Sequence, residues 1–368
     1  MTEQYTCEVL CAELQTYRNE LLTYAKIMPD EQKLVYLLII LIQISSITSF
    51  EPFTVISASI LAGSAIYGGY NKYVCHFNEC CDSSWIPYNF TMLETSLQEH
   101  LFGQHLAYNI VVRALKAHIR EHSSPKKALA FSFHGMSGSG KTFVSQFIIN
   151  SLYKLGLQSK YAHFFAGRSN FPMESKVDTY KMELTELIRG KVTECERSLF
   201  VFDEVDKIPK GVLDAVKPFL DYHEQINGVD FRKAIFIFLS NTGSQVIVER
   251  LMKMWENGTK RGDIQLGDFE NLIRTGAFNE KGGLHKSETI ENHLIDHYVP
   301  FLPLEEVHVR QCIEAEFHRR GKRFPHEEHI KEVLRYLTFG PEPHKLFSNS
   351  GCKRIIPKVA AVMELLDI

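Results

Sequence analysis

Residues 135–142 read Gly135-Met-Ser-Gly-Ser-Gly-Lys-Thr142, which fits the pattern Gly-x4-Gly-Lys-Thr in full. The preceding segment, Ala128 to Phe133, is short and apolar and predicts a buried strand, and Thr142 to Leu155 has the spacing of an amphipathic helix. A strand, a glycine-rich turn and a helix in this order point backbone N–H groups and a helix N-terminus at a phosphate. The stretch therefore predicts a nucleotide-binding α/β domain.

Each residue of this loop has an expected role. The Lys141 charge would reach the β- and γ-phosphates of ATP, and the Thr142 hydroxyl would bind Mg²⁺. The alternative is a chance glycine-rich turn, which the flanking strand and helix make a poor explanation. The other residues expected to contact ATP are Gly135, Met136, Ser137, Gly138, Ser139, Gly140 and Phe143.

Strand and helix signals alternate along the rest of the domain, which predicts a parallel sheet flanked by helices. The further expected strands are Tyr161–Phe165, Leu199–Phe202 and Ala234–Leu239, and the expected helices are Leu93–Arg120, Met182–Val192 and Val212–Tyr222. After Pro303 the strand signals stop, and helical patterns over 304–319, 327–337 and 355–366 predict a small C-terminal helical domain.

Acidic and amide side chains follow two of these strands. Asp203 and Glu204 come after the strand at 199–202, where ligands bind in parallel sheets. We expect Asp203 to bind Mg²⁺ and Glu204 to polarise the attacking water. Asn241 ends the strand that should lie between the other two, where it would contact the γ-phosphate or the water, although asparagine also commonly begins loops.

Composition and the N-terminus bear on location. Lys and Arg number 41 against 44 Asp and Glu, so no basic excess indicates a nucleic-acid partner. Residues 34–44 form an apolar run with the length of a signal-peptide core, behind an unusually long leader; a start at Met28 or an uncleaved anchor are alternatives. A second apolar stretch, 52–70, favours membrane association over a buried core helix.

The pair Asp203-Glu204, the strand ending in Asn241 and the helical domain together resemble the AAA+ ATPases. Leu101-Phe-Gly-Gln-His105 is similar to the Gly-Gln box found near adenine in that class. The segment from Leu294 to Leu304 resembles the connection between the two domains in the Clp-like branch, in which an arginine usually stands where this chain has Leu294.

Longer blocks resemble the torsins over roughly residues 50–357. The blocks are Phe202-Asp-Glu-Val-Asp-Lys207, Lys217-Pro-Phe-Leu-Asp-Tyr222, Phe236-Ile-Phe-Leu-Ser-Asn-Thr-Gly243 and Gly351-Cys-Lys353. We accordingly expect a leader at 1–50, a membrane-associated segment at 51–70, a large α/β domain at 71–302 and a small domain at 303–368.

The resemblance implies an ATPase of the endoplasmic reticulum lumen and perinuclear space that remodels protein or membrane assemblies. It would associate peripherally with the membrane and form homo- or hetero-oligomers, as a ring or a filament. Its arginine finger would come from the lumenal domain of a membrane-bound activator, because Leu294 replaces the usual residue; Arg261 and Arg274 stay as alternatives. The isolated chain should then hydrolyse ATP slowly.

The resemblance also implies roles for residues outside the loop. Lys353 would act as the second sensor of the γ-phosphate, Cys352 would pair with Cys312, and Cys75 would pair with Cys195. Buried reduced thiols are the alternative for Cys312 and Cys352, and a zinc site is a weaker alternative for the cysteines at 75, 80 and 81. Asn89-Phe-Thr and Asn257-Gly-Thr are N-glycosylation sequons.

Two other functions stay open at this point. The chain could be a nucleotide-gated scaffold with little turnover. It could also be a threading unfoldase, whose aromatic pore loop would come from Phe164-Phe-Ala-Gly-Arg-Ser-Asn-Phe-Pro172, although Phe164 and Phe165 are expected in the strand's core.

Overall fold

The computed structural model describes residues 74–120, 125–280, 282–285 and 294–365. The chain divides into two units, Met1–Asn78 and Glu79–Ile368, and the folded core belongs to the second. The leader and both apolar runs lie outside the described residues, so the expectations for them stay predictions. Within the described ranges, no helix has both the length and the apolar character needed to cross a bilayer.

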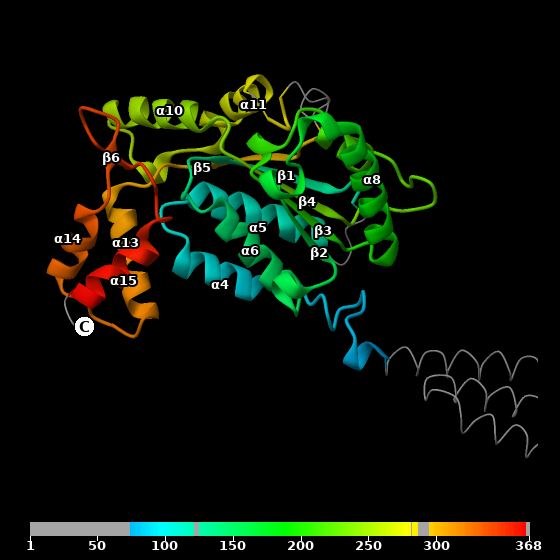
Figure 1. Ribbon diagram of the computed structural model, residues 1–368, viewed down its shortest axis with the longest axis horizontal. Helices are drawn as coiled ribbons and strands as arrows, with labels where there is room; N and C mark the ends of the chain where they lie inside the picture. The colour runs from blue at the N-terminus through cyan, green and yellow to red at the C-terminus, as the bar shows by residue number, and fades with distance from the viewer. Residues whose placement is uncertain (1–73, 121–124, 281, 286–293, 366–368) are drawn as a thin grey trace, which may run out of the picture. The chain divides into compact units, whose positions relative to one another are not determined.

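Five parallel strands form the central sheet in the order β2-β3-β4-β1-β5 (Figure 1). Their bounds are β1 Leu129–Gly135, β2 Ala162–Ala166, β3 Leu199–Asp203, β4 Ile235–Ser240 and β5 His297–Phe301. Strand β4 lies between β3 and β1, as expected for the strand that ends beside Asn241. Strand β5 pairs with β1 and was not predicted, because its sequence was interpreted as a connection between domains.

Helices cover both faces of the sheet (Figure 1). One face carries α4 Phe90–His100, α5 His105–Ile119 and α6 Lys141–Leu152; the other carries α8 Val177–Glu194, α10 Ser244–Glu256 and α11 Glu270–Asn279. Side chains alternate along each strand, so on β3 Leu199 and Val201 pack under the first layer while Phe200 and Phe202 pack under the second. This three-layer packing explains why the strands are apolar throughout.

Two predicted helices were wrong in detail. The segment 93–120 is two helices, α4 and α5, because the chain turns between them at Gly103, whose φ is +69°. The segment 212–222 is a 3₁₀ helix, Val212–Val216, followed by the short α9, Lys217–Leu220. Pro218 lies in the first turn of α9, where a backbone N–H has no partner within the helix, so proline is tolerated there. Inside one longer helix the same proline would remove a hydrogen bond, which is why a new helix begins here.

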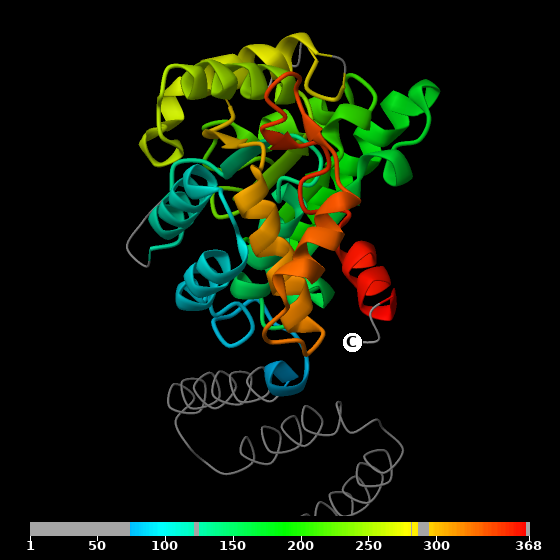
Figure 2. The same ribbon diagram turned by 90° about the vertical axis from the view of Figure 1, so that its left-hand side faces the viewer.

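The small C-terminal region is helical, as predicted. Helices α13 Glu306–Arg319, α14 Glu327–Arg335 and α15 Ile355–Leu365 pack around their own apolar core, and Figure 2 shows them grouped together. A two-stranded hairpin, β6 Phe339–Gly340 with β7 Phe347–Ser348, was not predicted, because each strand has only two residues. The turn after β7 leads to α15 and brings residues 350–353 to the phosphate loop.

Candidate nucleotide-binding site

Lys141 begins α6, and its ammonium group lies inside the phosphate loop. Only 7% of the residue is exposed, and its Nζ donates to Gly135 O at 2.7 Å, to Met136 O at 3.0 Å and to Asn241 Oδ1 at 3.0 Å. Among the described residues no carboxylate forms an ion pair with it. Burial lowers the pKa of Lys141 to about 8, although the charges of Asp203 and Asp206 oppose that shift. A buried cation held by neutral oxygens suits an anionic ligand.

Asn241 lies just beyond the end of β4, beside that lysine. Its Oδ1 accepts from Lys141, while its backbone N and its Nδ2 donate to Asp206 Oδ1 at 3.2 and 3.3 Å. The amide therefore has one orientation, with its oxygen toward the phosphate loop. This places Asn241 where a γ-phosphate contact was expected, at the carboxyl edge of the sheet.

Asp206 is a site residue that sequence reasoning missed. Burial alone would raise the pKa of its carboxyl group, but the hydrogen bonds from Lys207 and Asn241 and the Lys207 charge lower the pKa overall. Its Oδ2 lies 2.9 Å from Lys207 Nζ. Asp206 follows the predicted acidic pair by only two residues, but nothing local indicates that it orients Asn241 from the next strand.

Thr142 and Asp203 meet directly. The Thr142 hydroxyl donates to Asp203 Oδ2 at 2.9 Å, which joins the start of α6 to the end of β3. These are hard oxygen donors of the kind that Mg²⁺ prefers, so the pair fits that ion. Glu204 follows Asp203 with φ +52°, and its Oε2 lies 3.9 Å from Arg168 Nε. Its side chain is 44% exposed, so the carboxylate is accessible to water.

The turn that carries Lys353 contacts the phosphate loop. Cys352 N donates to Gly138 O at 3.1 Å, and a Cβ added at Gly138 would lie 2.0 Å from Ser350 O. Only glycine allows this approach, because φ at Gly138 is +81°. Lys353 is exposed on this turn, and its charge helps to lower the pKa of Lys141 after the larger effect of burial.

Gln104 of the Gly-Gln pair joins the phosphate loop to the connection between the domains. Its Nε2 donates to Ser139 O at 2.9 Å and to Leu302 O at 2.8 Å, and its Oε1 accepts from Leu302 N at 2.9 Å. At Gly103 an added Cβ would lie 2.6 Å from the ring of His308 in α13. Phosphate loop, sheet and small domain therefore meet at this pair.

The two arginines considered as internal fingers differ in their contacts. Arg261 donates to Gly103 O, Pro303 O and Glu305 Oε1 at 2.7 to 3.1 Å, so its guanidinium is fully engaged within the chain. Arg274 lies in α11 and contacts Asn271 at 3.5 Å. Leu294, at the position usually held by arginine, is 3% exposed and belongs to the apolar core.

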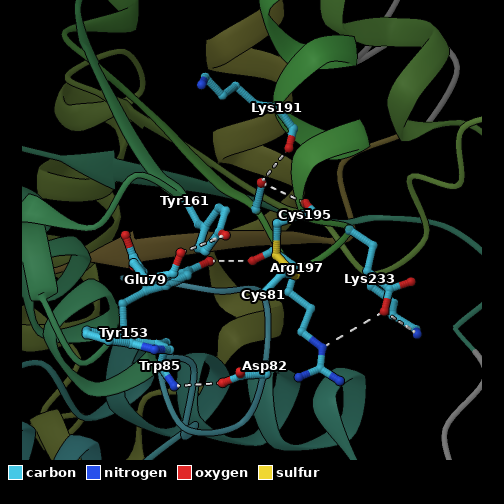
Figure 3. The surroundings of a disulfide bond; sticks show 12 residues. Glu79, Cys81, Asp82, Trp85, Tyr153, Tyr161, Lys191, Cys195, Arg197 and Lys233 are labelled. Carbon is cyan, nitrogen blue, oxygen red and sulfur yellow. Dashed lines mark hydrogen bonds and ion pairs between the residues drawn. A yellow bond between two sulfur atoms is a disulfide. The ribbon is translucent and has the colours of Figure 1, made fainter. Parts of the chain in front are cut away.

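One predicted disulfide is wrong and one is present. Cys312 and Cys352 are bonded, whereas Cys195 is bonded to Cys81 and not to Cys75 (Figure 3). The segment from Glu79 lies against the end of α8, which brings Cys81 to Cys195 with their Cα atoms 5.4 Å apart. All six cysteines among the described residues are disulfide-bonded, so none of them offers the thiolate of a zinc site.

Polar contacts reinforce the Cys81–Cys195 bond. The Glu79 carboxylate accepts from Ser159 Oγ at 2.5 Å and from Lys160 N at 2.8 Å, and Figure 3 shows Tyr161 and Tyr153 around the same bond. These residues precede β2 and β3, so this anchor lies at the amino edge of the sheet, opposite the phosphate loop.

The remaining expected residues lie as follows. Phe143 is 42% exposed on α6, and its ring centroid is 4.6 Å from that of Phe147. Phe164 is 40% exposed, so its assignment to the core was wrong, whereas Phe171 is buried against Tyr180. Both sequon asparagines are exposed: Asn89 caps α4 through Met92 N at 2.9 Å, and Asn257 caps the end of α10.

Comparisons with known proteins find relatives over most of the chain. The torsin family model matches residues 75–202, and the model of the Torsin-1A C-terminal domain matches residues 304–360. A torsin-like protein of Caenorhabditis elegans is 40% identical over 89% of this chain and 94% of its own length. One of Drosophila melanogaster is 41% identical over 85% of this chain and 92% of its own length.

Among solved structures, the complex of S. cerevisiae Hsp104 with ADP matches with a TM-score of 0.50 and 18% identity, over 76% of this chain. An Hsp104–casein complex matches with a TM-score of 0.52 and 17% identity, also over 76% of this chain. This chain spans about half of each Hsp104 chain, 47% and 46%. At this identity the likeness concerns the fold alone.

The parallel sheet, the phosphate loop with its buried lysine and the helical C-terminal region fit the AAA+ fold. The identity to the two torsin-like proteins, together with the two matching family models, narrows the class. The chain belongs to the torsin family.

Proposed function

We propose that this torsin-family ATPase works in the lumen of the endoplasmic reticulum and the perinuclear space, peripherally attached to the membrane. There it would bind ATP with Mg²⁺ and use hydrolysis to remodel protein or membrane assemblies. The observation that carries the ATPase activity is Lys141, a buried cation inside the phosphate loop whose hydrogen-bond acceptors, among the described residues, are neutral oxygens. Thr142 and Asp203 are the residues that would hold the Mg²⁺.

Dependence on an activator is the second part of the proposal. Leu294 is buried in the core, and the Arg261 guanidinium donates to three acceptors within the chain. Neither side chain is therefore free to reach the ATP site of a neighbouring subunit. An arginine finger accelerates phosphoryl transfer by about 10³- to 10⁵-fold. We therefore propose that the lumenal domain of a membrane-bound partner supplies this residue.

The disulfides support an oxidising compartment. Cys81–Cys195 and Cys312–Cys352 join segments 114 and 40 residues apart in the sequence, and such bonds persist mainly in secreted or lumenal proteins. The exposed sequons at Asn89 and Asn257 agree with this location. Glycosidase treatment of the cellular protein, with Asn89→Gln and Asn257→Gln as controls, tests it: a glycosidase-sensitive mass supports the lumen, and an unchanged mass in every sample argues against it.

The activity is tested with the purified full chain and detergent-solubilised endoplasmic reticulum membranes. ATP hydrolysis should be slow for the chain alone and should rise clearly with the membrane fraction. Glu204→Gln chain with the same membranes is the control for contaminating ATPases, because it lacks the group that would polarise water. Fast hydrolysis by the chain alone, unaffected by membranes, would overturn the activator proposal.

A nucleotide-gated scaffold is the second candidate. The contact between the Cys352 turn and Gly138 favours it, because this contact couples the small domain to the loop that receives the phosphates. A scaffold needs ATP binding but not turnover. Full replacement of the wild type in cells by Glu204→Gln would favour the scaffold, and loss of function with ATP binding retained would favour catalysis.

A further inference from the structure

A buried polar network joins β1 to β4 immediately behind the phosphate loop. It consists of Ser132 and His134 on β1 and Ser240 and Thr242 at the end of β4, all 5% exposed or less. His134 and Ser240 are partners across the parallel strands. Buried polar groups between two apolar layers need mutual hydrogen bonds, so the network has one favoured arrangement.

The contacts fix the state of the His134 ring. Nδ1 lies 3.0 Å from Thr242 O, a carbonyl that only accepts, so Nδ1 carries the proton. Nε2 then accepts from the Ser132 hydroxyl at 2.6 Å. Burial lowers the pKa of His134 to about 4, so the imidazole is neutral at physiological pH. The ring is therefore a rigid bridge with one donor and one acceptor in use.

The hydrogen bond from Nδ1 links His134 to Thr242, and each of these residues is next in sequence to a residue of the ATP site. His134 precedes Gly135, whose carbonyl accepts from Lys141, and Thr242 follows Asn241, whose Oδ1 accepts from the same ammonium group. Ser240 Oγ accepts from Thr242 N at 3.1 Å, which adds a second hydrogen bond to the turn that contains Asn241. The spacing between the phosphate loop and Asn241 thus depends on the His134 contact.

We propose that His134 is a positioning residue of the ATP site, which holds Asn241 at the distance from the phosphate loop that recognises a γ-phosphate. Its side chain is fully buried and acts through Thr242 and Asn241. The proposal rests on ATP binding at this loop but not on the activator or the compartment. Because ADP lacks the γ-phosphate, the expected signature is a change in the preference for ATP over ADP.

The test measures equilibrium binding of ATP and of ADP, each with Mg²⁺, to the full chain carrying Glu204→Gln to prevent turnover. His134→Leu should weaken ATP binding by about 3- to 10-fold, the range expected for one neutral hydrogen bond, and leave ADP binding within about twofold. His134→Asn, which can still donate to Thr242 O, should restore most of the preference. Asn241→Ala should reproduce the loss, and adding His134→Leu to it should cause little further change.

His163→Leu is the matched control. His163 lies half-buried on β2, and burial lowers its pKa to about 4 as well. Its Nε2 has no hydrogen-bond partner among the described residues. The ATP preference of this variant should equal that of the parent.

Three results would overturn the proposal. They are equal weakening of ATP and ADP by His134→Leu, independent effects of His134→Leu and Asn241→Ala, and a loss of preference in the His163→Leu control. If His134→Leu does not fold, Ser132→Ala takes its place, because it keeps the histidine and removes the hydroxyl that orients the ring through Nε2. An ATP preference equal to that of the parent in this variant would contradict the proposal. Absence of ATP binding in the parent chain would contradict the ATPase function itself, which separates the two failures.

Discussion

Two buried lysines lie at opposite ends of β1 and are held in different ways. Lys127, before the strand, forms an ion pair with Asp296 Oδ2 at 2.9 Å and also donates to Leu294 O at 2.9 Å. Lys141, after the strand, donates to neutral oxygens and forms no ion pair within the part of the chain that the structure describes. The paired lysine closes the amino edge of the sheet, whereas the unpaired one leaves a positive charge for a ligand at the carboxyl edge.

The two disulfides repeat this contrast. Cys81–Cys195 ties the segment after Glu79 to the end of α8 at the amino edge, among buried side chains and far in the fold from the phosphate loop. Cys312–Cys352 lies in the small domain, and the backbone of Cys352 contacts Gly138. The same kind of bond therefore serves stability at one edge and the geometry of the site at the other.

The largest expected effect is on stability, from Lys127→Met. Removing this ammonium group leaves the Asp296 carboxylate without its cation, and breaking a buried pair costs about 3 kcal/mol or more. The free energy of unfolding from urea titration should fall by that amount, while ATP affinity below the transition stays as in the wild type. Loss of ATP affinity with stability intact would contradict the division between the two edges.

The next effect concerns the amino-edge disulfide. Cys81→Ser with Cys195→Ser should lower the free energy of unfolding by about 2–4 kcal/mol without changing the affinity for ADP. Cys312→Ser with Cys352→Ser is the matched pair, and it should change ADP affinity because the Cys352 turn contacts Gly138. Equal behaviour of the two pairs in the ADP titration would remove the distinction.

Lys141→Met should act on binding and spare stability. A hydrogen bond from a charged group contributes about 1.5–3 kcal/mol, so ATP affinity should fall by about 10- to 100-fold. The free energy of unfolding should stay the same or rise, because the substitution removes a buried charge that has no ionic partner. A large loss of stability would show that the lysine serves the fold and not a ligand.

The parts of the site that sequence reasoning found are those with local signals. The phosphate loop is specified by its own glycines, and Asp203 and Asn241 stand at the ends of recognisable strands, which meet at one edge of any parallel sheet. The same reasoning gave the class of fold, because alternating strands and helices leave few topologies.

The parts that were missed depend on contacts between distant segments. Asp206 matters only because Asn241 lies beside it, and Cys195 had several possible partners, since connectivity cannot be deduced from cysteine positions. Strand β5 contains Pro300, which argues against a strand except at a sheet edge, and β5 is an edge strand.

Lys141 keeps its positive charge available for the phosphates of ATP, and proton uptake on binding tests this role most directly. The pKa of Lys141 is lowered to about 8 in the free chain, and bound phosphate should raise it, with Asp203, Asp206 and Lys353 as the neighbouring charges. ATP affinity should therefore fall as pH rises through about 8, approaching about tenfold per pH unit above that value.

The measurement is calorimetric titration of ATP with Mg²⁺ into the full Glu204→Gln chain at pH 8, in two buffers with different ionisation enthalpies. We expect uptake of about half a proton per ATP bound, because about half of the Lys141 groups are neutral at a pH equal to their pKa. The Lys141→Met chain, titrated at higher concentration, should take up none. Binding without proton uptake, with affinity unchanged between pH 7 and 9, would contradict the account.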